Sequence, residues 1–217
     1  MPEQFLHGVE VVEVDDGIRP IQTVKSSIIG LIGTAPDADA AKFPLNEPVL
    51  IPGDQRMGAD LGAAGTLKDA LDGIFDQVGA MVAVVRVTEG VDTDATLSNI
   101  VGQSASVPGV HSFKGAESHS KVTPRLLISP GYTSQRPGNA ANPVVAELTG
   151  IANHLKSGIF ADGPGTTDAE AITYREDHDS DRIMVIDPGV TVWDTDANQH
   201  VLQPASARAA GVQAMLD

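Results

Sequence analysis

The apolar positions of the chain follow two alternating patterns. Short continuous apolar runs predict buried strands, at residues 24–32, 81–87, 125–130 and 182–188. Apolar residues spaced three and four positions apart predict helices at 66–79, 142–158 and 204–216, and shorter helices are predicted at 94–101 and 167–174. Strands that alternate with helices are typical of an α/β fold. We therefore expect a layered domain with a mostly parallel or mixed sheet flanked by helices.

Polar residues mark where several of these helices begin. Asn142 precedes Pro143, which places a capping side chain before a proline whose missing N–H costs nothing at the first helical position. Thr66 and Thr167 each have an acidic residue three positions later, the pattern of a capping box. Two helices are predicted to end at glycines, Gly79 and Gly158. Loops are predicted where Gly, Ser and Pro are frequent, at 108–121 and 132–142.

A short strand is predicted ahead of this domain. Residues 9–14 read Val-Glu-Val-Val-Glu-Val, and a turn signal follows at 15–17. Residues 18–24 contain Pro20 and are predicted to be extended or an edge strand. The first strand has no hairpin partner beside it in the sequence. It must therefore pair elsewhere in the chain, or add to the sheet edge of another subunit as a device for polymerisation.

The composition places the chain among folded proteins. It has 217 residues, 41% of them hydrophobic, which is enough for one large or two small domains. Cysteine is absent, and this excludes disulfides, thiol catalysis and cysteine-ligated metals. The sequence shows neither a signal-peptide pattern nor an apolar run of membrane-spanning length. We expect a soluble protein made and used in the cytoplasm, without membrane anchoring.

The charge is strongly acidic and unevenly distributed. The chain carries 14 Lys and Arg against 29 Asp and Glu, a net charge of −15, which disfavours binding to a phosphate backbone. We therefore expect no nucleic-acid partner. The segment 162–196 contains ten acidic residues and only two basic ones. A solvated outer face is the favoured interpretation of this segment, and a patch for a basic partner or a cation is the alternative.

The glycines of the first buried run raise the question of a phosphate-binding turn. The spacing Gly30-x-x-Gly33 does not complete a Gly-x-Gly-x-x-Gly fingerprint, and no Gly-Lys-Ser/Thr sequence is present. We interpret them as close-packed glycines at a strand end, forming a tight exit from the strand. Ser129 follows another predicted strand, but its surroundings do not match the Gly-x-Ser-x-Gly nucleophile elbow. An α/β nucleotide- or small-molecule-binding enzyme domain remains the alternative function.

A second candidate for chemistry is the acidic sequence Arg-Glu-Asp-His-Asp-Ser-Asp at 175–181. Its alternate acids resemble half of a calcium loop, but the glycine and glutamate of an EF-hand are missing. His178 is too crowded along the sequence for a defined zinc site, and the other histidines lie in separate segments. The sequence therefore predicts no catalytic residues, no bound metal and no cofactor.

Eight sequence blocks resemble one known family in the same order. The first four blocks are HGVEVVEVDDGIRPIQTVKSSIIGLIGTAPDAD, FPLNEPVLI, GTLKDALDGIFDQ and VAVVRV. The later four are KVTPRLLISPGYT, VVAELTGIANHLKSGIFADGP, DRIMVIDP and PASARAAGVQAMLD. Together they span nearly the whole chain, and they resemble the tail sheath protein of contractile-tailed bacteriophages, of the myophage and prophage type.

The resemblance implies a structural protein and not an enzyme. Sheath subunits of this family form a six-fold helical polymer around the tail tube, and contraction drives the tube through the host envelope. The implied partners are other sheath subunits, the tail tube protein, and the baseplate and tail terminator proteins. The implied location is the virion tail, assembled in the cytoplasm of the host bacterium. A non-contractile cell-surface or adhesion module is a third hypothesis, and the missing signal peptide counts against it.

The resemblance also implies how the chain is divided. Residues 1–23 correspond to an N-terminal arm and linker, and 24–217 to an α/β sheath domain, as one unit or as two subdomains that divide near 103–124. The arm of the family exchanges strands with neighbouring subunits, and the matching residues here are Gly8, Val9, Glu10, Val11, Val12, Glu13 and Val14. Family members continue into a C-terminal core domain after the last block. That domain is expected to be absent from this chain, which alone should not form a complete sheath.

Overall fold

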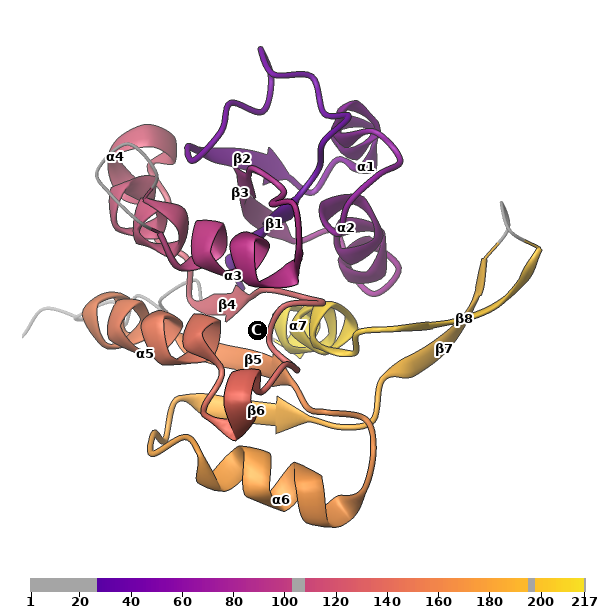
Figure 1. The fold of residues 1–217 in the computed structure, drawn as a ribbon. Helices are drawn as coiled ribbons and strands as arrows, with labels where there is room; N and C mark the ends of the chain where they lie inside the picture. The colour runs from indigo at the N-terminus through magenta and orange to yellow at the C-terminus, as the bar shows by residue number, and fades with distance from the viewer. Residues whose placement is uncertain (1–26, 103–107, 195–197, 217) are drawn as a thin grey trace, which may run out of the picture.

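The fold is built around one mostly parallel sheet. A computed structural model describes residues 27–102, 108–194 and 198–216. In sheet order the strands are β2 (Pro48–Pro52), β3 (Met81–Val87), β1 (Ile29–Thr34), β4 (Leu126–Ile128), β5 (Gly158–Asp162) and β6 (Ile183–Ile186). All neighbouring pairs are parallel except β2 with β3 (Figure 1). This arrangement confirms the predicted α/β class.

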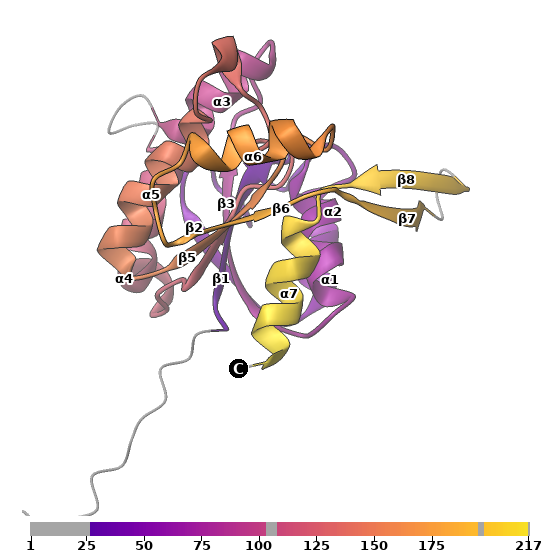
Figure 2. The same cartoon turned by 90° about the horizontal axis from the view of Figure 1, so that it is seen from below.

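Helices cover both faces of the sheet (Figures 1 and 2). One face packs against α1 (Gln55–Gly58), α2 (Leu67–Phe75) and α7 (Ser206–Leu216), and the adjoining turn Ala59–Leu61 is a 3-10 helix. The other face packs against α3 (Thr93–Val101), α5 (Pro143–Leu155) and the 3-10 segment η2 (Gly109–Gly115). The remaining elements are α4 (Ala116–Ser120), the 3-10 turn Pro137–Asn139 and α6 (Asp168–Glu176). The two faces therefore have separate apolar cores.

The order of the parallel strands is that of a doubly wound sheet. Counted along the chain, the five parallel strands lie in the order 2-1-3-4-5, and the winding reverses between β1 and β4. Because β1 pairs directly with β4, segments before and after 103–124 contribute to the same sheet. The division into two subdomains near that point stays a prediction.

Strong local signals located several elements correctly. The strand predicted at 81–87 coincides with β3, and six of its seven residues are buried. Asn142 caps α5, since its Oδ1 accepts from the Val144 N–H at 2.9 Å and from the Val145 N–H at 3.1 Å. Thr167 caps α6 through the N–H of Glu170 at 3.3 Å. These elements carry both their pattern and their cap within a few residues, which explains the agreement.

Other boundaries were predicted wrongly. The first strand begins at Ile29 and continues through Thr34, so Gly30 and Gly33 lie inside the strand and do not form a tight exit at its end. α2 ends at Phe75, before the predicted Gly79, and Gly158 begins β5 instead of ending α5. The predicted loop at 108–121 contains η2 and α4. At these positions tertiary packing outweighs the local tendency of Gly, Ser and Pro to end helices and strands.

Two strands form an unpredicted hairpin. β7 (Val190–Asp194) pairs antiparallel with β8 (Gln199–Gln203) as a separate two-stranded sheet. Figures 1 and 2 show the hairpin projecting from the body beside the start of α7. The β-branched and aromatic residues of β7, Val-Thr-Val-Trp at 190–193, are the signal that could have located it.

Candidate functional site

The carboxyl edge of the sheet is where a doubly wound fold would bind a ligand, at the reversal between β1 and β4. In this protein, hydroxyl groups of the chain itself bond across that point. Thr34 at the end of β1 shares a 2.9 Å hydrogen bond between its Oγ1 and the Tyr132 hydroxyl. The Thr34 N–H donates to Thr66 Oγ1 at 3.3 Å. Thr66 consequently does not cap α2 with its side chain, and the predicted capping box there is wrong.

The two glycines of β1 allow close packing. A Cβ at Gly30 would lie 2.7 Å from Leu127 Cδ2, and a Cβ at Gly33 would lie 2.5 Å from Thr66 Oγ1. Both glycines are buried within the strand. Both glycines make room for neighbouring side chains, so the predicted role in close packing is confirmed. The interpretation as a tight exit from the strand is wrong, because both lie inside β1.

The candidate nucleophile is enclosed by the protein. Ser129 follows β4 and is fully buried, so solvent and substrate have no access to its hydroxyl. Its Oγ also has no hydrogen-bond partner, and thus lacks the neighbouring base that would activate a serine nucleophile.

A buried carboxylate joins the end of β5 to the start of α7. Asp162 accepts hydrogen bonds from the Ser206 N–H at 2.8 Å, from Ser206 Oγ at 2.6 Å and from Thr133 Oγ1 at 3.3 Å. Burial raises the pKa of Asp162, and these hydrogen bonds oppose the rise. The carboxylate satisfies the first N–H group of α7, at the end where the helix dipole favours negative charge. Asp162 therefore fixes α7 to the sheet.

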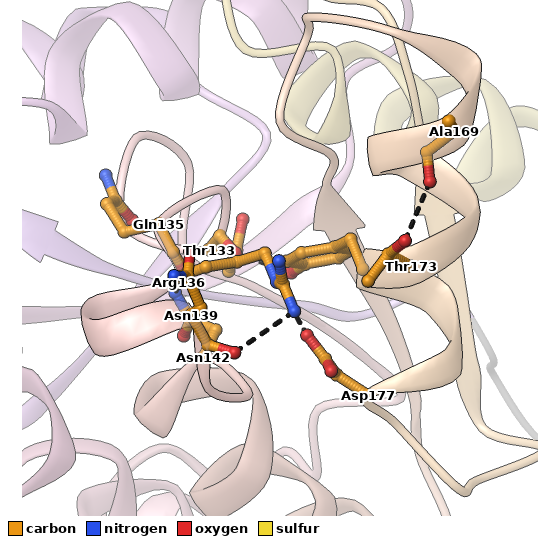
Figure 3. Close-up of polar contacts among 9 residues, drawn as sticks. Thr133, Gln135, Arg136, Asn139, Asn142, Ala169, Thr173 and Asp177 are labelled. Carbon is orange, nitrogen blue, oxygen red and sulfur yellow. Dashed lines mark hydrogen bonds and ion pairs between the residues drawn. The ribbon is translucent and has the colours of Figure 1, made fainter.

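The loop after β4 holds α6 in place, as Figure 3 shows. Arg136 Nε donates to Asp177 Oδ2 at 2.6 Å, and another guanidinium nitrogen donates to the Asn139 carbonyl at 3.2 Å. Arg136 lowers the pKa of the Asp177 carboxyl by this contact. The hydroxyl of the fully buried Tyr174 donates to the Thr133 carbonyl. The Arg136–Asp177 and Tyr174–Thr133 contacts were beyond sequence reasoning because each joins residues 41 positions apart.

The acidic segment separates into structural and solvated residues. Asp162 and Asp177 hold α7 and α6, as described above. Five other acids of the segment are exposed, namely Asp168, Glu170, Glu176, Asp179 and Asp181, whereas Asp187 and Asp194 are half-buried. Among the described residues, no three His, Asp or Glu side chains are grouped so that they could hold a metal ion. The exposed acids agree with the interpretation as a solvated face.

His178 makes the stability of the protein depend on pH. The ring is buried against Tyr174, its Nε2 has no hydrogen-bond partner, and burial lowers its pKa below the ordinary 6.5. Asp177 opposes this shift, and Arg175 and Arg136 add to it. Below pH 6.5 the unfolded chain binds the proton more strongly than the folded chain. The contribution of His178 to stability is therefore present above pH 6.5 and is lost as the pH falls.

We predict that His178→Phe flattens the dependence of unfolding free energy on pH below 6.5. The slope should fall by up to ~1.4 kcal/mol per pH unit, because one titrating group is removed. Urea unfolding monitored by circular dichroism between pH 5 and 7 measures the slope. The matched control is His154→Phe on the exposed surface of α5. Equal slopes in both variants and the unmodified protein would contradict the assignment.

The strand predicted at Gly8–Val14 lies outside the described residues, so its pairing stays a prediction. In the described part of the chain, no helix is both long and apolar enough to cross a membrane.

Comparison with known proteins relates the chain to tail sheaths. Residues 26–87 match the family described as "Tail sheath protein Gp18 domain III N-terminal region". The tail sheath protein of Escherichia phage P2 is 35% identical over 98% of this chain and 54% of its own length. The major tail sheath protein of Serratia phage KSP20 is 36% identical over all of this chain and 55% of its own length. The chain thus spans about half the length of these curated relatives.

A solved structure supports the fold. The helical sheath of the anti-feeding prophage in its contracted state matches with a TM-score of 0.55 at 18% identity. The match covers 98% of this chain and 53% of that one. At this level of identity the likeness concerns the arrangement of strands and helices alone.

Proposed function

We propose a structural role in a contractile phage tail sheath, because the chain is similar in sequence to tail sheath proteins. The protein would polymerise around a tail tube, and contraction of the polymer would drive genome delivery or tube penetration through the host envelope. The observation that carries this proposal is the 35–36% identity with two tail sheath proteins over essentially the whole chain. The role would be structural and not enzymatic, as the names of both relatives suggest.

The proposed partners follow from this role. They are other sheath subunits in a six-fold helical polymer, the tail tube protein, and the baseplate and tail terminator proteins. The protein would be assembled in the host cytoplasm and reside in the virion tail. Residues 24–217 would supply the α/β sheath domain, and residues 1–23 the arm, with Gly8–Val14 as the strand donated to a neighbouring subunit.

The alternative function, binding of a nucleotide or small molecule by an α/β domain, is less well supported. The doubly wound strand order is compatible with it, but Thr34 bonds to both Tyr132 and Thr66 at the place where the ligand would lie. A ligand at 100 times its dissociation constant would stabilise the folded state by ~2.7 kcal/mol. A thermal-shift screen with nucleotides that shows no stabilisation would exclude those ligands.

We predict that the gene product containing this chain forms tubes or rings, visible by negative-stain electron microscopy. Deleting residues 1–17 should abolish long polymers, because the donated strand and its backbone hydrogen bonds are lost. Val11→Pro should weaken polymerisation in the same direction, since proline removes a donor from the strand. The matched control is Glu10→Gln, which keeps every backbone N–H.

Two outcomes separate the parts of this proposal. Polymers that persist unchanged after deletion of residues 1–17 would contradict the strand donation while leaving the sheath role intact. A full-length product that forms no polymer, and that is missing from purified tails, would contradict the sheath role itself.

A further inference from the structure

The projecting hairpin has one exposed apolar face. Thr191 pairs with Leu202 and Trp193 pairs with His200, so these four side chains lie on the same face of the two strands. Trp193 is 50% exposed and Leu202 is 72% exposed. The Trp193 and His200 rings meet edge to face, with centroids 5.0 Å apart. A two-stranded hairpin with an exposed apolar face is marginally stable alone and is stabilised by packing against a partner.

The hairpin is also entirely acidic in its charged residues. No Lys or Arg occurs between Arg182 and Arg208, whereas this interval contains Asp187, Asp194 and Asp196. The apolar face carries the single tryptophan of the chain, and acidic residues lie near it in the sequence. Such a face fits a partner surface that is apolar and basic.

Such a surface lies at the amino ends of β5 and β6, whereas the hairpin follows the carboxyl end of β6. A groove of about 450 Å³ opens where β5 and β6 begin. Phe160, Ile183 and Met184 form its apolar part. Phe160 and Met184 occupy register-paired positions of the two strands, and Met184 is 56% exposed. Lys156 and Arg182 line the groove with positive charge, together with one acid, Asp181. The groove thus combines an apolar surface with a basic rim.

Arg182 is held in position by the body of the protein. Its Nε donates to Asn153 Oδ1 at 2.9 Å, and a terminal nitrogen donates to the Ser157 carbonyl at 3.4 Å. Both acceptors are neutral. The positive charge of Arg182 is therefore available to an incoming acidic segment.

Three other pockets lack this combination. The pocket at the root of the hairpin contains Arg208, but that side chain already bonds Asp76 and Gln203. A pocket beside α3 has Asp94 as its one charged residue. The pocket at the start of α6 contains Asp168 and Asp187. An acidic hairpin would be repelled from the last two.

We propose that the hairpin of one copy docks through Trp193 into the β5–β6 groove of a second copy. This inference rests on the self-association in the proposed function, and it names an interface separate from the N-terminal strand. Net charges of −15 repel two copies in most orientations, and pairing the acidic hairpin with the Lys156 and Arg182 rim relieves this locally. Recognition would be apolar at the centre and electrostatic at the rim.

The positions of the two surfaces determine the kind of assembly. The hairpin leaves the carboxyl end of β6, and the groove lies at the amino ends of β5 and β6. Different surfaces meet in such a contact, so it is head-to-tail and can repeat from copy to copy. Repetition gives a ring or an open helix, whereas contact between identical surfaces would give a closed pair.

The absence of cysteine allows a direct test by disulfide cross-linking of the full chain. His200→Cys labels the hairpin face, and Met184→Cys labels the groove. A mixture of the two variants should form disulfide-linked pairs under mild oxidation, while each variant alone should form few. Val91→Cys, at a position that is 99% exposed and outside both surfaces, is the control for random collision.

A second measurement tests the anchor. Trp193→Ala in the His200→Cys chain should reduce the cross-linked yield about tenfold, as expected for loss of a central tryptophan anchor. Ile172→Ala, which removes an exposed apolar side chain on α6, should leave the yield unchanged. Rising salt should also reduce the yield, because the acidic hairpin and basic rim are screened.

The outcomes distinguish this interface from the sheath role. Pairs formed by His200→Cys alone in the yield expected of the mixture would mean that hairpins meet each other, and would overturn the proposal. A mixture that cross-links no more than Val91→Cys would also overturn it, even if the gene product forms tubes. Specific pairs without any tubes would support the interface and contradict the proposed function.

Discussion

Replacing Asp162 with alanine should lower the free energy of unfolding by about 2–4 kcal/mol. The carboxylate accepts hydrogen bonds from the Ser206 N–H, the Ser206 hydroxyl and the Thr133 hydroxyl, all within the protein interior. Alanine leaves these buried donors without an acceptor, and each unsatisfied group costs about 1–3 kcal/mol. Relief of the buried charge offsets part of this cost. The change should lower Tm by roughly 5–15 °C in a domain of this size.

Two further variants identify the source of the loss. Asp162→Asn keeps the shape and one acceptor oxygen, so it should cost less than alanine, because a rotated hydroxyl can accept from the new amide. Asp179→Ala removes an exposed acid from the same acidic segment and should change stability by less than ~0.5 kcal/mol. Urea unfolding of the three variants measures the differences. An Asp162→Ala protein as stable as Asp179→Ala would show that Asp162 does not fix α7.

This buried contact also shows why sequence patterns describe the elements better than their connections. β3 and the capped start of α5 are encoded by neighbouring residues, and both were located from the sequence. Asp162 and Ser206 lie 44 positions apart. Within the sequence, Asp162 is one acid of a strongly acidic segment, and only the packing of α7 on the sheet makes it a buried acceptor.

The candidate surfaces were predictable to different degrees. The close packing of Gly30 and Gly33 was predicted, although their position inside β1 was not. The hairpin was missed because its strands are short and half-exposed, so neither has the continuous apolar run used to locate the buried strands. The exposure of Trp193 could not be predicted from the sequence, because it depends on the hairpin projecting away from the body (Figure 2). The groove at Met184 joins two strand ends that are distant in sequence.

Replacing Gly30 with valine should destabilise the protein by about 2–3 kcal/mol, the upper part of the ~1–3 kcal/mol that overpacking a core costs. A Cβ at this position would meet Leu127 Cδ2 at 2.7 Å and carbons of Phe113 and Pro124 at 3.0 Å each. The matched control is Gly150→Val in α5, where an added Cβ has no atom within 4 Å. That control should change stability by less than ~0.5 kcal/mol, because valine adds no clash and has at least the helix propensity of glycine.

A double-mutant cycle between Gly30 and Leu127 tests whether packing against Leu127 is the reason for glycine at position 30. Leu127→Ala alone should cost about 2–5 kcal/mol, since it empties part of a close-packed core. In the double variant the valine occupies part of that space, so the total cost should be about 1–2 kcal/mol less than the sum of the single changes. Denaturant unfolding of all four proteins closes the cycle. If the losses of unfolding free energy simply add, the two positions do not pack directly against each other. A role of Gly30 in contacting a ligand would give no reason for Leu127→Ala to compensate the valine.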